Sequence, residues 1–138
     1  MTIKGGCLCG AVTYEITGEP MFAGHCGCES CQKSSGTGHN SVAAYPDGQI
    51  QRHGATTKYV EQGDSGQPTT REFCPTCGSR LFSSATVMPG VTMVTLGTME
   101  PGTEPSPQMF IYGKRRRAWD AVDASTPVLE GMPAGPPN

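Results

Sequence analysis

The chain has 138 residues, of which 36% are hydrophobic and 7% aromatic, and it carries 19 glycines and 12 prolines. This length fits a single domain spanning residues 1–138, and the composition disfavours a helical bundle and favours short strands joined by turns. The formal net charge of −2 gives no global indication of binding to nucleic acid or to an anionic membrane. In chain order, a hairpin is expected over residues 3–16, and residues 21–24 form a short strand that leads into a cluster of cysteines.

The middle of the chain predicts one helical segment followed by further short strands. The segment Cys28–Ser35 predicts one or two helical turns that end at Gly36, because glycine readily adopts the left-handed conformation that closes a helix. Trp119 is the only tryptophan, and we expect it in the sparse core. The tail from about Thr126 is rich in proline and glycine, so we expect it to be irregular. The further strands are expected at residues 40–45, 50–53, 56–60, 79–83, 91–96 and 108–112.

All seven cysteines lie in three tight groups. They are Cys7 and Cys9, then Cys26, Cys28 and Cys31, and finally Cys74 and Cys77. Closely spaced cysteines indicate metal sites, because one soft cation needs several thiolates that converge on it. No apolar run approaches the length of a membrane span and no hydrophobic segment follows the initial Met, so we expect a cytoplasmic protein. Thiols stay reduced there, which favours metal ligands over disulfides.

The first and last cysteine groups predict a closed, structural zinc site. Cys74 and Cys77 are separated by two residues and followed by Gly78, which is typical of a metal-binding knuckle. A knuckle supplies only two ligands, and Cys7 and Cys9 are the obvious second pair. Four thiolates complete a tetrahedron and leave no open position, so this site is predicted to stabilise the fold.

The central group, Cys26, Cys28 and Cys31, can bind a second metal and leave a fourth position for water or substrate. Three thiolates make such a zinc electron-rich, so it suits a soft ligand such as a substrate thiolate. Two other interpretations remain open. His25 or His39 could close the site as a second structural centre, or Cys28 and Cys31 could form a redox pair.

The order and spacing of the motifs resemble a known family. The motifs are Gly6-Cys7-x-Cys9-Gly10, then Cys28-x-x-Cys31 followed by Ser35-Gly36, and then Phe73-Cys74-x-x-Cys77-Gly78. Together they resemble the glutathione-dependent formaldehyde-activating enzyme family, also called the centromere-protein-V family, and the C-terminal region is similar to that family as well. The resemblance implies a mainly β, Mss4-like fold of short twisted antiparallel sheets around zinc. It also implies two Zn²⁺ ions per chain, one structural at Cys7, Cys9, Cys74 and Cys77 and one catalytic at Cys26, Cys28 and Cys31.

The activity that the resemblance implies is that of a carbon–sulfur lyase. Such an enzyme joins a thiol, such as glutathione, to formaldehyde or another small electrophile, so the expected partners are a small-molecule thiol and an aldehyde. One position departs from the family, which usually has histidine between the first two cysteines of the central motif, where this chain has Gly27. The proton required by the new alkoxide could come from His25, Glu29 or His39.

Several alternatives to this interpretation stay open. The chain could be a non-catalytic, zinc-stabilised binding module, or a thiol cluster that responds to zinc or to oxidation. The basic run Lys114–Arg117 is either a solvated turn or an anion site for carboxylates such as those of glutathione. We expect no nucleic-acid partner and no membrane association, and a homodimer could form through an exposed strand edge.

Overall fold

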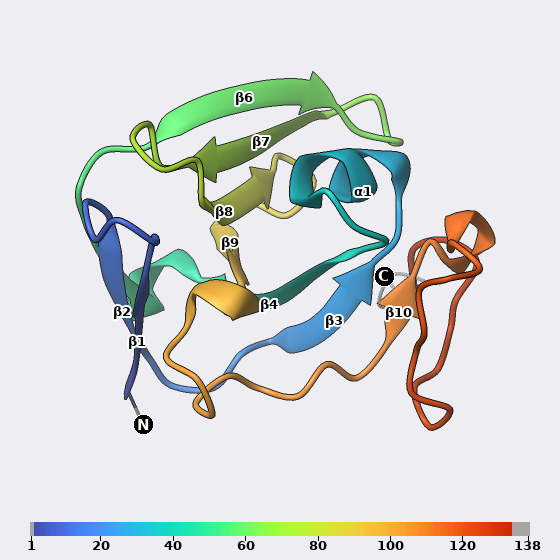
Figure 1. Ribbon diagram of the computed structural model, residues 1–138. Helices are drawn as coiled ribbons and strands as arrows, with labels where there is room; N and C mark the ends of the chain where they lie inside the picture. The colour runs from blue at the N-terminus through green and yellow to red at the C-terminus, as the bar shows by residue number, and fades with distance from the viewer. Residues whose placement is uncertain (1, 134–138) are drawn as a thin grey trace. The chain divides into compact units, whose positions relative to one another are not determined.

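The computed structural model describes residues 2–133 (Figure 1), which form ten β-strands, one α-helix and three short 3-10 turns. The mainly β prediction is therefore confirmed. The chain divides into two compact units, one of Met1–Phe22 with Ala43–Pro105 and the other of Ala23–Val42 with Ser106–Asn138. Among residues 2–133, no helix is long and apolar enough to cross a membrane.

The first unit contains a three-stranded antiparallel sheet in the order β1-β2-β5. Its strands are β1 (Thr2–Gly6), β2 (Thr13–Thr17) and β5 (Ile50–His53). Strands β1 and β2 form the predicted hairpin, with Gly6 opposite Thr13. Ile3, Tyr14 and Ile16 are buried, and their alternation with exposed neighbours is typical of strands that pack one face on a core. The hairpin loop carries Cys7 and Cys9.

The first unit also contains a second run of strands, in the order β4-β9-β8-β7-β6. Strand β4 (Asn40–Pro46) enters this unit at Ala43. The others are β6 (Thr57–Gln62), β7 (Pro68–Phe73), β8 (Arg80–Ala85) and β9 (Val91–Thr95). Fully buried Tyr45, Leu81, Phe82 and Val94 form the core, and the ring of Phe82 meets that of Tyr14 edge-on. The turn between β7 and β8 carries Cys74 and Cys77.

The 3-10 turns η1 (Asp47–Gln49) and η2 (Leu96–Thr98) complete the first unit. A partly buried ion pair also lies here. Arg52 Nη1 donates to both carboxylate oxygens of Glu72 at 3.0 Å, and the Arg52 guanidinium lies 4.0 Å from the centroid of the Phe82 ring. The ion pair and the packing of Arg52 on Phe82 thus connect β5 to β7 and β8.

The second unit is built from three strands in the order β10-β3-β4, with one helix. Strand β3 (Phe22–Cys26) leads into helix α1 (Glu29–Ser35), as the sequence predicts. Strand β10 (Phe110–Ile111) runs parallel to β3, with Phe110 beside His25 and Ile111 beside Cys26. The sheets are therefore mixed and not wholly antiparallel, a difference from the expected pattern. The 3-10 turn η3 (Gly113–Arg115) follows β10 and carries the start of the basic run.

The prediction that Trp119 lies in the core is wrong, because its side chain is 67% exposed. A tight turn in which Asp120 N–H donates to the Arg117 carbonyl at 3.0 Å directs the next side chain, Asp120, inward. Trp119 consequently points to solvent, and the fully buried aromatic residue of this unit is Phe110. Residues 126–133 are irregular apart from one bridge between Val128 and Phe110. The remainder of the tail, residues 134–138, lies outside the described residues.

Candidate metal centres

Four thiols come together in the first unit, from two segments that are far apart in sequence. Cys7 and Cys9 lie on the β1–β2 loop, and Cys74 and Cys77 lie between β7 and β8. Gly78, with φ of +78°, closes the knuckle by donating its N–H to the Cys74 carbonyl at 2.9 Å. A left-handed residue is required there, which explains the glycine. The loop and the knuckle are joined by the Leu8 N–H, which donates to Ser79 Oγ at 3.1 Å.

The spacing of these sulfurs fits a tetrahedral cation. Sγ of Cys9 lies 3.6 Å from Sγ of Cys7 and 3.7 Å from Sγ of Cys74. All four sulfurs lie within 4.8 Å of one another. Zinc–sulfur bonds of about 2.3 Å in a tetrahedron would place two sulfurs about 3.8 Å apart. The donor set is therefore suited to one soft divalent metal ion, and it has no place for a further ligand.

Backbone and hydroxyl donors surround these sulfurs. The Ser79 hydroxyl lies 3.2 Å from Cys77 Sγ, and hydrogen bonding from that hydroxyl and from the Ser79 N–H lowers the pKa of the Cys77 thiol. The Val12 N–H donates to Cys7 Sγ at 3.3 Å, and the Thr76 N–H donates to Cys74 Sγ at 3.4 Å. Donors directed at sulfur favour the thiolate, which is the form that binds metal.

Three further thiols come together in the second unit, where β3 meets α1. Cys26 ends β3, Cys28 is the N-cap of α1, and Cys31 lies in the first turn of the helix. Cys28 Sγ accepts a hydrogen bond from the Cys31 N–H at 3.3 Å, so it caps the helix as a serine or aspartate would. Gly36 ends the helix in the left-handed conformation, as predicted. The three sulfurs lie within 4.8 Å of one another, and all three cysteines are partly exposed.

The three thiols do not titrate independently. Hydrogen bonds with the Cys26 and Cys31 thiols lower the pKa of Cys28, although burial opposes this shift. Hydrogen bonds with Cys28 and Cys31, together with burial, raise the pKa of Cys26. The cluster therefore forms one thiolate readily and resists forming the next without a cation. A divalent metal would relieve this repulsion and release protons as it binds.

Gly27 lies between two of these cysteines and leaves no room for a side chain. A Cβ at this position would come within 2.6 Å of Cε1 of Phe110 and 2.8 Å of its Cζ. The Phe110 ring also packs against the rings of His25 and His39, with centroids 6.0 Å and 5.5 Å away. Phe110 thus occupies the volume that a histidine at position 27 would need.

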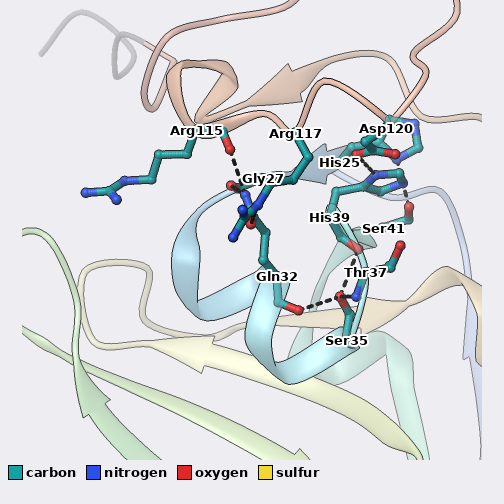
Figure 2. A network of polar contacts seen from close by, with 10 residues as sticks. All are labelled: His25, Gly27, Gln32, Ser35, Thr37, His39, Ser41, Arg115, Arg117 and Asp120. Atoms are coloured by element: carbon teal, nitrogen blue, oxygen red, sulfur yellow. Dashed lines mark hydrogen bonds and ion pairs between the residues drawn. The ribbon is translucent and has the colours of Figure 1, made fainter.

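The two histidines of this unit have polar partners of their own (Figure 2). His25 Nδ1 lies 2.7 Å from Ser41 Oγ, and His39 Nδ1 lies 2.6 Å from Oδ2 of buried Asp120. The two rings meet edge-on with centroids 4.6 Å apart. Burial and the nearby His39 lower the pKa of His25, although Asp120 opposes this shift. Among the described residues, the three-thiol group includes no histidine nitrogen.

The family profile described as "Glutathione-dependent formaldehyde-activating enzyme" matches residues 2–115. The chain belongs to this family. A curated protein of Halomonas elongata that carries the same name is 30% identical over 87 residues, which is 59% of this chain and 55% of that protein. The match thus spans about half the length of that relative. The crystal structure of a Rhodobacter sphaeroides protein, a structural-genomics target, has a TM-score of 0.56 and 24% identity, covering 74% of this chain and 91% of that one. At 24% identity, the similarity to this structure shows a shared fold and nothing about activity.

One buried side chain joins the basic run Lys114–Arg117 to the backbone between Cys26 and Cys28. Gln32, which follows Cys31 on α1, donates from Nε2 to the Gly27 carbonyl at 2.7 Å and to the Arg115 carbonyl at 2.8 Å (Figure 2). Its Oε1 accepts from Arg117 Nε at 2.6 Å. One amide therefore links the backbone between two cysteines to the run that begins at Lys114.

Sequence reasoning places all seven cysteines in the two groups that the structure brings together. It misses Gln32, Ser41 and Asp120. Asp120 lies 81 positions from its partner His39, so no local pattern connects them. Of the expected proton donors, the exposed Glu29 forms ion pairs with Lys33 at 3.2 Å and Arg115 at 3.9 Å.

Proposed function

We propose that this chain is a zinc-dependent enzyme of the carbon–sulfur lyase type, which joins a thiol such as glutathione to formaldehyde. Membership of the glutathione-dependent formaldehyde-activating family supports the substrate class. The observation that carries the proposal is the group of three partly exposed thiols, Cys26, Cys28 and Cys31, whose sulfurs lie within 4.8 Å of one another without a fourth protein ligand among the described residues. Three protein ligands with one open position are typical of catalytic zinc.

The two metal centres have different roles in this proposal. Cys7, Cys9, Cys74 and Cys77 hold a structural zinc that joins the β1–β2 loop to the β7–β8 turn. Cys26, Cys28 and Cys31 hold the second zinc, and because no fourth donor joins them within residues 2–133, the sulfur of the substrate has room to bind. The fit of the sulfur spacing to a tetrahedral ion supports the first assignment. The partial exposure of the second cluster supports access by a small thiol.

The reaction itself is an addition without change of oxidation state. When bound, zinc supplies a positive charge that favours a substrate thiolate over the thiol and polarises a carbonyl oxygen. The thiol sulfur forms a bond to the aldehyde carbon, the carbonyl π-electrons move to oxygen, and that oxygen takes up the proton that the thiol lost. The product is a hydroxymethyl thioether, and the reverse reaction breaks the same carbon–sulfur bond.

A side chain must return the proton to oxygen, and we assign this role to His39, which lies in the same unit as the three thiols. A carboxylate only accepts hydrogen bonds, so Asp120 holds the proton of His39 on Nδ1 and leaves Nε2 available for proton exchange. The partner of His25 is the Ser41 hydroxyl, which can donate or accept and therefore does not fix the proton of His25 on one nitrogen. Glu29 is engaged by two cations. These contacts favour His39 over the other two candidates.

Exchange spectroscopy by NMR tests the proposal. Glutathione and formaldehyde form their adduct spontaneously, so the measured quantity is the exchange rate between free and bound formaldehyde with and without the zinc-loaded chain. We expect a concentration-dependent acceleration that is absent from Cys28→Ser and Cys31→Ser variants with unchanged circular dichroism. A wild-type chain with both zincs bound and no acceleration would contradict the proposal and favour a binding module with two structural metals. A cytoplasmic location, which we also propose, would supply glutathione and keep the thiols reduced.

A further inference from the structure

The basic loop, defined as Lys114–Arg117, lines a pocket together with helix α1. We propose that this pocket binds the carboxylate groups of the thiol substrate and so selects an anionic peptide thiol over a neutral one. This inference rests on the proposed function, because it concerns the substrate of the three-thiol site. The pocket has a volume of about 460 Å³, which falls within the range of about 300–1,000 Å³ common for small-ligand sites.

The charge in this pocket is strongly unbalanced. Five cationic side chains line it, from Lys33 and the basic loop, against the single carboxylate of Glu29. Glu29 already pairs with Lys33 and Arg115. Neither Lys114 nor Arg116 has an ion-pair partner within residues 2–133. Two cations thus remain for an anionic ligand, in a chain whose formal net charge is −2.

Backbone hydrogen bonds anchor the two residues that lead into the basic loop. Tyr112 precedes it with φ of +58°, a left-handed conformation that is uncommon for a residue with a side chain. The Gly113 N–H donates to the Leu129 carbonyl at 2.7 Å, and the Tyr112 N–H donates to the Gly131 carbonyl at 3.2 Å. An anchored loop loses little conformational entropy on binding, which distinguishes it from an ordinary solvated turn.

The pocket also lies on the helix that carries the thiols. Glu29 and Gln32, which line it, flank Cys31 on α1, and Cys28 caps the same helix. Gln32 bonds to the carbonyl of Gly27, between Cys26 and Cys28, and to the basic loop through Arg115 and Arg117. A ligand held by the loop therefore lies beside α1, the helix that Cys28 caps and that carries Cys31.

The ligand chemistry follows from these groups. Guanidinium groups bind carboxylates through paired, charge-assisted hydrogen bonds. A peptide thiol of the glutathione kind carries two carboxylates, one ammonium and one thiol. The two carboxylates match Lys114 and Arg116, the two cations that the pocket leaves without an ion-pair partner among residues 2–133. With the carboxylates held, the thiol is positioned toward Cys26, Cys28 and Cys31, so binding energy remote from the sulfur orients it for reaction.

Direct binding to the zinc-loaded full chain tests the inference independently of catalysis. The probe is S-methylglutathione, which keeps both carboxylates and the ammonium but has no thiol. Its binding is measured by titration calorimetry and by the fluorescence of Trp119, the only tryptophan, which is 67% exposed and two positions from the basic loop. We expect saturable binding that weakens about threefold to tenfold in each of Lys114→Gln and Arg116→Gln, from the usual strength of charged contacts at a partly exposed site.

A matched control and a second probe decide what the pocket recognises. Lys58→Gln removes the same charge from exposed β6 in the other unit, and it should leave binding unchanged. Inorganic phosphate should compete only weakly. Equal affinity for phosphate, or equal losses in Lys58→Gln and Arg116→Gln, would overturn the assignment to substrate carboxylates, as would the absence of saturable binding in both measurements.

Kinetics with two thiols separate this inference from the proposed function. Arg116→Gln should lower kcat/KM for glutathione about threefold to tenfold through KM, and should leave the rate with neutral 2-mercaptoethanol unchanged. Equal effects on both thiols would overturn the pocket assignment while the proposed function stands. Binding of S-methylglutathione with the expected dependence on Arg116, but no catalysis with either thiol, would overturn the proposed function while the anion pocket stands.

Discussion

The backbone of Gly27 packs directly against the ring of Phe110. A Cβ at position 27 would lie 2.6 Å from Cε1 of that ring, which is closer than two non-bonded carbon atoms approach each other. Phe110 is fully buried and contacts both histidines of the second unit. The glycine in the central cysteine motif and the aromatic residue 83 positions later in the sequence therefore form one packing unit, which fixes the path of the chain between Cys26 and Cys28.

We expect Gly27→Ala to destabilise the fold by about 1–3 kcal/mol, the usual range for overpacking a buried position. Phe110→Leu on its own should also be destabilising, because it leaves a cavity. The two changes together should be less harmful than their sum, because the smaller side chain leaves room for the new methyl group. Chemical denaturation of the four proteins gives the coupling free energy.

Gly48→Ala is the control for this cycle, because nothing lies within 4 Å of a Cβ at that position. We expect it to be neutral or slightly stabilising. A Gly27→Ala protein as stable as Gly48→Ala would contradict the packing described here.

The His39–Asp120 pair should affect catalysis more than binding. Asp120→Asn keeps the size of the side chain but removes the charge that fixes the proton on His39 Nδ1. We expect kcat to fall about 10-fold to 100-fold, below the full range of about 10²–10⁴ for loss of a general acid–base group, with little change in KM. His39→Gln should cost at least as much, and the double variant little more. The pH profile of kcat should change shape in both variants.

Ser41→Ala removes the partner of His25 in the same network and serves as the control. Because the proposal assigns no proton transfer to His25, we expect its kcat to stay close to that of the wild type. A larger effect for Ser41→Ala than for Asp120→Asn would transfer the proton role to His25.

The Arg52–Glu72 pair should stabilise the first unit. Glu72 is buried and accepts bonds from Arg52 and from Thr56 Oγ1 at 2.7 Å. Burial opposes ionisation, but these hydrogen bonds and the charge of Arg52 lower the pKa of Glu72 overall. At neutral pH, Glu72→Gln should cost about 1–2 kcal/mol, a figure reduced because Arg52 is about one-third exposed.

The exposed pair between Lys4 and Glu15, 3.5 Å apart, offers the comparison for this effect. Glu15→Gln should change the free energy of unfolding by no more than about 0.5 kcal/mol. Equal losses for the two variants in urea denaturation would show that the partly buried pair stabilises the fold no more than the exposed pair does.

Loss of a ligand should have different consequences at the two metal centres. Cys77→Ser should abolish the cooperative thermal transition, because the zinc proposed for the four-thiol site would couple metal binding to the folding of the first unit. Cys31→Ser should keep the fold and lose one zinc, because α1 stays capped by Cys28 and Gly36. Differential scanning calorimetry with zinc analysis measures both. A Cys31→Ser protein that melts as early as Cys77→Ser would remove the distinction between the sites.

The sequence predicts the features that depend on local chemistry. The spacing of Cys74 and Cys77 with Gly78, the helix that ends at Gly36, and the β1–β2 hairpin all result from short-range rules for turns and caps. The grouping of the cysteines into a set of four and a set of three is also predictable. Closely spaced cysteines indicate metal ligands, and an odd total leaves one cysteine unpaired if all the others form disulfides. The single-domain prediction and the edge-to-edge homodimer stay predictions.

The features that the sequence does not predict depend on contacts between distant segments. The parallel pairing of β10 with β3 brings Phe110 beside His25, and no local pattern encodes it. The exposure of Trp119 results from one turn at Arg117 that directs Asp120 inward instead. In the sequence, Gln32 has the pattern of an ordinary polar helix residue, and its role becomes evident only from its hydrogen bond to the Arg115 carbonyl. These long-range contacts build the surroundings of the three thiols, whereas the thiols themselves are evident in the sequence.

The central claim is that one metal centre is closed and the other is open to a substrate thiol. The measurement that tests it most directly is the zinc content per chain before and after dialysis against millimolar glutathione, with the fold followed by circular dichroism. We expect glutathione to reach only the zinc at Cys26, Cys28 and Cys31, so that this zinc either carries bound glutathione or is lost, while the zinc at Cys7, Cys9, Cys74 and Cys77 is retained and the spectrum stays unchanged. Two zincs retained at every glutathione concentration, with no glutathione bound to the chain, would contradict the account.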